Sequence, residues 1–127
     1  MGDYTPKYKV DEPATYTAGA AITGGQVVYL SAAGQCQLTS AASANVLGIA
    51  TRDVASGELV AVVRGGVQRC VPAAAITVGQ PLKSAASGRV TPMTIGTDPQ
   101  DQYIGFALTA ASGAATPATI DVQWNRS

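Results

Sequence analysis

Residues 20–26 read Ala-Ala-Ile-Thr-Gly-Gly-Gln, and residues 74–80 read Ala-Ala-Ile-Thr-Val-Gly-Gln, an offset of 54. Gly34 matches Gly88 at that same offset, and residues 46–50 match residues 103–107 at an offset of 57. Such self-similarity indicates a duplicated unit. Two units of about fifty residues are too short to be independent domains. We therefore predict one domain over residues 20–127, with pseudo-twofold copies at about 20–72 and 74–127.

The segments between the turns have the composition of β-strands. Short runs rich in Val and Ile recur about every ten residues and are bounded by Gly, Ser, Asn and Pro, which is typical of a sandwich or barrel. No segment has the length and composition of a long helix. We therefore predict an all-β fold, with strands at 26–30, 35–38, 46–51, 59–64, 67–71, 80–83, 89–91, 103–108 and 119–124.

Glycines stand where this pattern requires turns. Gly65 and Gly66 separate two Val-rich runs, and both can adopt the positive φ of a type I′ turn, so we predict a hairpin there. The three extra residues of the second copy, near Asp98, predict a surface loop. The predicted structural turns lie at Gly25, Gly34, Gly57, Gly65, Gly66, Gly79 and Gly88.

The first nineteen residues stand outside the repeat. From residue 4 to residue 10 the chain alternates, with tyrosines and other apolar residues on one face and Thr and Lys on the other. An extended segment of this kind is suited to adding a strand to the sheet edge of a partner. The alternatives are a frayed terminus and the first edge strand of the domain itself. The residues alone leave these alternatives open; an arm at 1–19 would bind through Tyr4, Lys7, Tyr8, Lys9 and Val10.

Charge and hydropathy narrow the choice of partners. Eight basic and eight acidic residues cancel, so the chain lacks the basic footprint of a protein that binds nucleic acid. No window approaches the ~20 apolar residues of a membrane span. The first ten residues contain no apolar run that could serve in a signal peptide. We expect no nucleic-acid or membrane partner, and synthesis in a cytoplasm.

The residues needed for common chemistry are missing. The chain has no histidine, which removes the usual general base and the usual catalytic triads. Cys36 and Cys70 alone cannot complete a structural zinc site. We favour buried thiols over a disulfide, because a reducing cytoplasm disfavours the bridge. The acidic pairs at 11–12 and 98/101 lie in Pro-containing loops, where solvated surface is their ordinary role. We therefore expect no enzyme activity, catalytic residues, metal or cofactor.

The order of elements resembles the small head decoration (cement) proteins of tailed bacteriophages. The resemblance is carried by residues 21–30, Gly34, residues 46–54, Gly57, Glu58 and Gly66, and by their counterparts in the second copy. It implies a β-barrel or β-tulip domain that forms homotrimers at three-fold or quasi-three-fold axes. It also implies that the protein binds the major capsid protein on the outer surface of the mature head, stabilises the shell, and is assembled in the host cytoplasm. The resemblance also favours the arm over its two alternatives, so we predict an N-terminal arm at 1–19 that binds the capsid.

A carbohydrate-binding or adhesin-like β module is the alternative. Such a module needs exposed aromatic side chains on one face. Outside the arm segment the aromatic residues are Tyr29, Tyr103, Phe106 and Trp124. Their strand context favours core positions for most of them, and Trp124 in particular is expected to pack.

Overall fold

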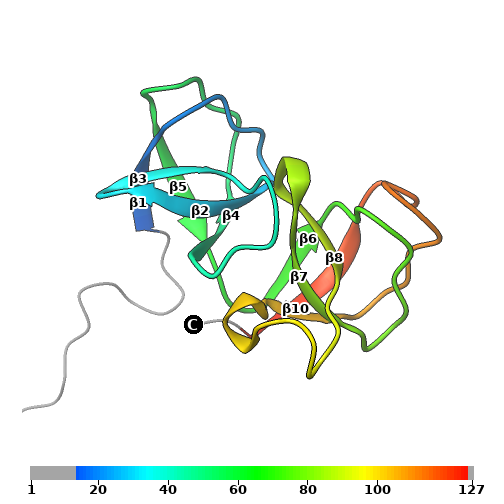
Figure 1. The fold of residues 1–127 in the computed structure, drawn as a ribbon. Coiled ribbons are helices and arrows are strands. Elements are labelled where there is room, and N and C mark those ends of the chain that lie inside the picture. Colours follow the sequence, from blue (N-terminus) through cyan, green and yellow to red (C-terminus); the bar gives the residue numbers. More distant parts are fainter. Residues whose placement is uncertain (1–13, 126–127) are drawn as a thin grey trace, which may run out of the picture.

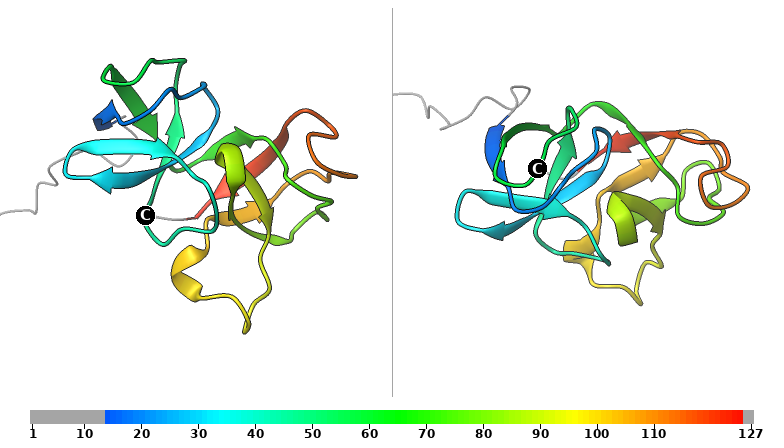
Figure 2. Two further views of the ribbon diagram at one scale, coloured as in Figure 1. Left: turned by 45° about the horizontal axis from the view of Figure 1, so that its top comes forward. Right: turned by 90° about the horizontal axis from the view of Figure 1, so that it is seen from above.

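The computed structural model describes residues 14–125 and has two halves that lie side by side (Figures 1 and 2). The first half contains β1 (Ala14–Ala18), β2 (Val27–Ala32), β3 (Gln35–Leu38), β4 (Val46–Ala50) and β5 (Leu59–Val63). The second half contains β6 (Val67–Cys70), β7 (Pro81–Ala85), β8 (Arg89–Pro92), β9 (Gly105–Ala107) and β10 (Ile120–Trp124), with short 3₁₀ turns η1 (Ala86–Gly88) and η2 (Gln100–Gln102). Across residues 14–125 no helix has the length and apolar character needed to cross a bilayer.

The first half is a closed barrel with the strand order β1-β3-β2-β4-β5. The second half is a five-stranded sheet with the order β6-β10-β9-β7-β8. Its edge strands approach each other near the parallel bridge between Pro72 and Val90. The predicted all-β fold with a barrel is confirmed, and each predicted strand is present with its ends shifted by a few residues at most.

The two halves share a circular strand order and several backbone hydrogen bonds. The parallel pair Ala18↔Cys36 in the first half has its counterpart, 54 residues on, in the Pro72↔Val90 bridge. Gly25 N donates to the carbonyl of Ala50 at 2.8 Å, and Gly79 N donates to that of Ala107 at 2.7 Å. These halves run from 14 to 63 and from 67 to 124, so each starts several residues before the copy predicted from the sequence. The duplication itself remains an interpretation of the sequence.

Two sequence predictions need correction. Residues 14–18 fall within the predicted arm but form β1, which pairs with β5 and β3 inside the barrel. The predicted hairpin at Gly65 and Gly66 is wrong, because β5 pairs with β1 and β4, whereas β6 pairs with β10. The two glycines have φ values of 88° and 61°. They carry the chain from the first half into the second.

The core consists of two clusters. One lies within the barrel and includes Val28, Val60 and Val62, and the other combines Val27 of the first half with residues such as Leu82 of the second. Because the second cluster draws on both halves, apolar burial fixes one half against the other.

Both cysteines are free and buried, one in each cluster. Burial raises the pKa of the Cys36 thiol, and it raises that of Cys70 to about 12. The prediction of buried thiols is confirmed. A thiol in such surroundings behaves as a small apolar side chain.

Candidate functional site

Two loops of the second half form a surface without charged side chains. Residues 71–80 connect β6 to β7, and residues 108–119 connect β9 to β10; neither loop contains Asp, Glu, Lys or Arg. Ile76 and Ala111 exchange backbone hydrogen bonds of 2.9 Å in both directions, and Ala115 N donates to the carbonyl of Pro72 at 2.8 Å. These bonds hold the loops together. We call this surface the charge-free face.

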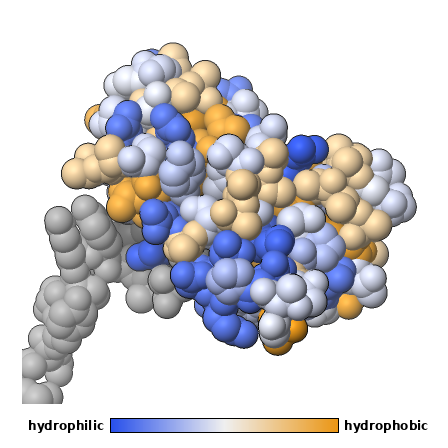
Figure 3. All heavy atoms as spheres, viewed as in Figure 1, coloured by the Kyte–Doolittle hydropathy of each residue, from blue (hydrophilic) through white to orange (hydrophobic). Residues whose placement is uncertain are grey.

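Apolar side chains are exposed on the charge-free face. Val78 is 60% exposed and Leu108 is 38% exposed. Gly79 N donates a hydrogen bond to the carbonyl of Ala107. Because Gly79 follows Val78 and Ala107 precedes Leu108, the backbone segments that carry Val78 and Leu108 are adjacent. The loop end on the right of Figure 3 is mostly white, tan and orange. Depletion of charge is the compositional mark of the buried centre of a protein interface, so this face has the character of a contact surface.

The first half provides an internal comparison. Its counterpart to residues 108–119 begins at 51 and carries Arg52, Asp53 and Glu58. Asp53 accepts a hydrogen bond from Gly24 N at 2.8 Å, and Arg52 donates to the carbonyl of Leu59 at 2.6 Å. The same type of loop therefore accommodates charge in the first half. The absence of charged side chains from residues 108–119 is therefore a property of the sequence of this loop rather than of the fold.

The loop after β8 is the predicted surface insertion, and its residues 94–97 are exposed. Asp98 braces it, accepting hydrogen bonds from Thr94 N at 2.8 Å and from Lys83 Nζ at 3.0 Å. The bond from the Thr94 backbone and then the contact with Lys83 lower the pKa of Asp98. The carboxylate form therefore holds the turn closed against β7.

We expect Asp98→Asn to lower the melting temperature by a few degrees at neutral pH. A lowered pKa in the folded state means that Asp98 stabilises the fold above its unfolded pKa of ~3.9 and loses this effect as the pH falls through the folded value. The difference between wild type and variant should therefore shrink below about pH 4. Thermal unfolding across a pH series measures it. A difference that persists unchanged at low pH would contradict the assigned role of the charge.

The predicted site residues divide into two groups. The arm residues Tyr4, Lys7, Tyr8, Lys9 and Val10 lie outside the described residues, so their role stays a prediction. The predicted turn glycines all have positive φ, between 61° and 92°: Gly25, Gly34, Gly57, Gly65, Gly66, Gly79 and Gly88.

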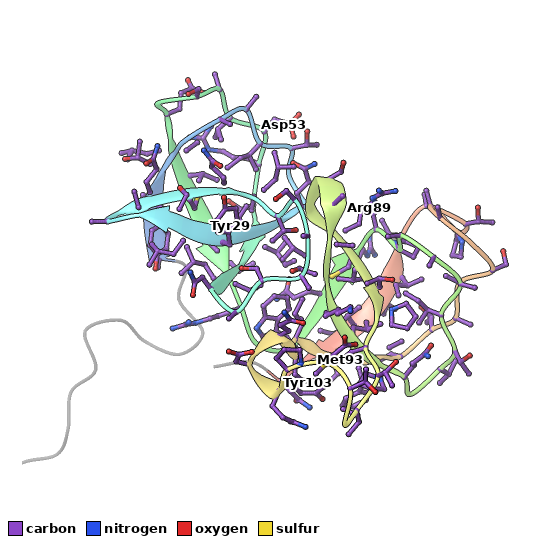
Figure 4. The ribbon with its side chains drawn as sticks, viewed as in Figure 1. Tyr29, Asp53, Arg89, Met93 and Tyr103 are labelled. Atoms are coloured by element: carbon purple, nitrogen blue, oxygen red, sulfur yellow. The ribbon has the colours of Figure 1, made fainter. Side chains whose placement is uncertain are left out.

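Within residues 14–125, Trp124 provides no exposed aromatic surface. Trp124 is only 3% exposed and belongs to the core cluster shared by the two halves, as the sequence predicted. Tyr103, labelled in Figure 4, accepts a hydrogen bond from Asn125 Nδ2 at 3.2 Å. A sugar-binding role for Trp124 in the folded protein is therefore incompatible with its burial.

The charge-free face was not identified from the sequence, although part of its signal is present there. Residues 70–82 and 102–120 contain no charged side chain. Either uncharged stretch alone is unremarkable in a chain with so few charged residues. Only the fold brings the two loops together, through the pairing of Ile76 with Ala111.

Comparison with known proteins places the chain among structural components of phage heads. The family model of the phage cement proteins matches residues 8–124. This match spans both halves and most of the chain. The protein belongs to the phage cement protein family and is thus a head-associated component of the virion.

A solved structure has a similar fold. The head fiber gp8.5 N base of bacteriophage phi29 superposes with a TM-score of 0.62 at 20% identity, over 91% of this chain and 94% of that one. At this identity the likeness establishes the fold alone. No curated protein sequence matches.

Proposed function

We propose that this protein binds the outer surface of the mature phage head as a trimer at three-fold or quasi-three-fold axes and stabilises the shell. The observation that carries the proposal is the family match over residues 8–124. The major capsid protein is the partner. The role needs no catalysis and no cofactor.

The mechanism is thermodynamic. A protein that binds only the expanded lattice lowers the free energy of that lattice through linkage. A trimer that engages several capsomers at once gains further affinity, because each later contact is intramolecular and has a high effective concentration.

We assign the trimer contact to the charge-free face and the capsid contact to the N-terminal arm. β1, which follows the arm, lies at one end of the molecule, and the charge-free loops lie at the other end (Figures 1 and 2). Contacts through the charge-free face would place the second half of each of the three subunits at the three-fold axis. The three arms would then start from the periphery, where neighbouring capsomers are within reach.

Co-sedimentation with capsids tests the proposal. Purified protein should bind saturably to undecorated expanded heads and not to unexpanded procapsids. Bound protein should raise the temperature at which the heads lose their contents. Equal binding to both shells, or binding to neither, would contradict the cement role.

Deleting residues 1–10 should abolish binding to expanded heads while leaving the far-UV circular dichroism of the β domain intact. The deletion ends before β1, so the barrel keeps all its strands. Unchanged binding of the shortened protein would refute the arm assignment while leaving the cement role in place.

A further inference from the structure

A small hollow lies on the first half, apart from β1 and from the charge-free face. Its volume is about 210 Å³, and it is lined by Tyr29 of β2 and by the loop residues Ser40, Ala41, Ala42 and Ser43. Tyr29 is half-buried, on the strand beside this loop (Figure 4). Pockets for drug-sized ligands measure ~300–1,000 Å³. This hollow is therefore of a size for one ring rather than for an extended ligand.

The wall of the hollow is fixed by two buried polar side chains, one from each half, that bond across to the other half. Ser84, which is 1% exposed, accepts a hydrogen bond from Ser43 N at 2.9 Å and donates one to the carbonyl of Ala41 at 2.8 Å. At the start of the loop, the fully buried Thr39 donates to the carbonyl of Ala85 at 2.9 Å. Buried, satisfied hydrogen bonds of this kind make a loop rigid. The hollow is therefore formed in advance, and a ligand would not have to order its wall.

The lining chemistry selects a ligand class. The hollow offers the aromatic ring of Tyr29, methyl groups and serine hydroxyls, and no carboxylate or cationic side chain lines it. Ser43 Oγ accepts a bond from Asn45 N at 3.1 Å, so its own proton remains available to donate. An anionic ligand such as a phosphate would find no cation there, and a purely apolar ligand would leave the hydroxyls unpaired.

We propose that the hollow binds a single neutral sugar ring. The ring would stack on Tyr29 and exchange hydrogen bonds with the hydroxyls of Ser40 and Ser43. This combination of an aromatic surface and a few placed polar groups is what orients ligands in such sites. The proposal goes beyond the cement role and does not rest on it. It would give a head-bound protein a contact for polysaccharide.

Titration of the full-length ¹⁵N-labelled protein tests this binding. The probes are methyl glucoside, methyl galactoside, N-acetylglucosamine and rhamnose, with N-acetylneuraminic acid as the charged comparison. For at least one neutral sugar we expect saturable amide shifts confined to Tyr29 and residues 40–43. The charged sugar should produce none at equal concentration, because no cation lines the hollow.

Variants separate a sugar site from a general surface effect. Tyr29→Ala should weaken binding about tenfold or more, equivalent to ~1.4 kcal/mol, whereas Tyr29→Phe keeps the ring and should retain it. If Tyr29→Ala fails to fold, Ser40→Phe fills the hollow from an exposed position and should also prevent binding. The proposal is overturned if no neutral sugar shifts these amides, if the shifts lie elsewhere, or if the charged sugar binds equally well.

Discussion

Replacement of Gly105 by Ala is expected to destabilise the protein by about 2–3 kcal/mol or more. A Cβ at this position would overlap the backbone carbonyl of Gln123 on the neighbouring strand β10, and Asn125 N would lie 3.2 Å away. Backbone atoms of a paired strand cannot rotate aside, so either the β9–β10 ladder must shift or the core must open. Overpacking of this type costs ~1–3 kcal/mol, and occasionally more.

The effect can be measured by thermal and urea unfolding. Trp124, the one tryptophan of the chain, is buried in the shared core, and its fluorescence reports loss of that core. For a domain of this length the melting temperature should fall by about 10 °C. Gly48, the counterpart of Gly105 in the first half, faces the carbonyl of Val63 in the same way and should behave similarly.

Gly113 provides the matched control. A Cβ there would meet nothing within 4 Å, and its φ lies outside the left-handed region. Gly113→Ala should therefore stay within ~0.5 kcal/mol of wild type. If Gly105→Ala is as stable as this control, the close approach of β9 and β10 is refuted.

The success of the strand predictions has a local cause. Val- and Ile-rich runs with turn residues at both ends carry the information in a few adjacent residues, and β3 occupies the predicted residues 35–38. The sequence prediction places residues 14–18 in the arm because they lie outside the repeated heptapeptides. Thr15, Tyr16 and Thr17 are nevertheless good strand formers. The position of β1 in the barrel depends on pairing with β5, which lies more than forty residues away in the sequence.

The hairpin at Gly65 and Gly66 shows the limit of local reasoning. Two consecutive positive φ values were predicted and are observed, yet the strands on either side do not pair. Gly66 O instead accepts a bond from Trp124 N at 2.8 Å. Turn chemistry fixes where a chain can reverse, but the partner of a strand is set by distant residues and by the core it closes.

The proposed contact surface had to come from the fold for the same reason. Two uncharged segments form one surface only because hydrogen bonds such as those between Ile76 and Ala111 bring the segments together. Likewise, the hollow beside Tyr29 depends on Ser84, which belongs to the other half and lies more than forty residues from the loop it holds.

Introducing charge into the charge-free face should weaken binding to expanded heads by two to four orders of magnitude. The variant is Val78→Asp combined with Leu108→Asp. Both side chains are exposed, so the folded monomer should tolerate the change, and its melting temperature should stay within a few degrees of wild type. In an interface, however, each new carboxylate would be buried without a partner. Loss of the trimer removes the gain from effective concentration, typically 10²–10⁴-fold.

The measurement is co-sedimentation over a range of protein concentrations, with chemical cross-linking of the protein bound to the heads. Ala33→Asp, in the exposed β2–β3 turn of the first half, adds charge away from the face and should leave both results unchanged. Wild-type protein should cross-link to trimers on the lattice, whereas the double variant should not. If the double variant binds and cross-links as wild type does, the trimer contact lies elsewhere. If it cross-links to trimers but no longer binds, the charge-free face contacts the capsid itself.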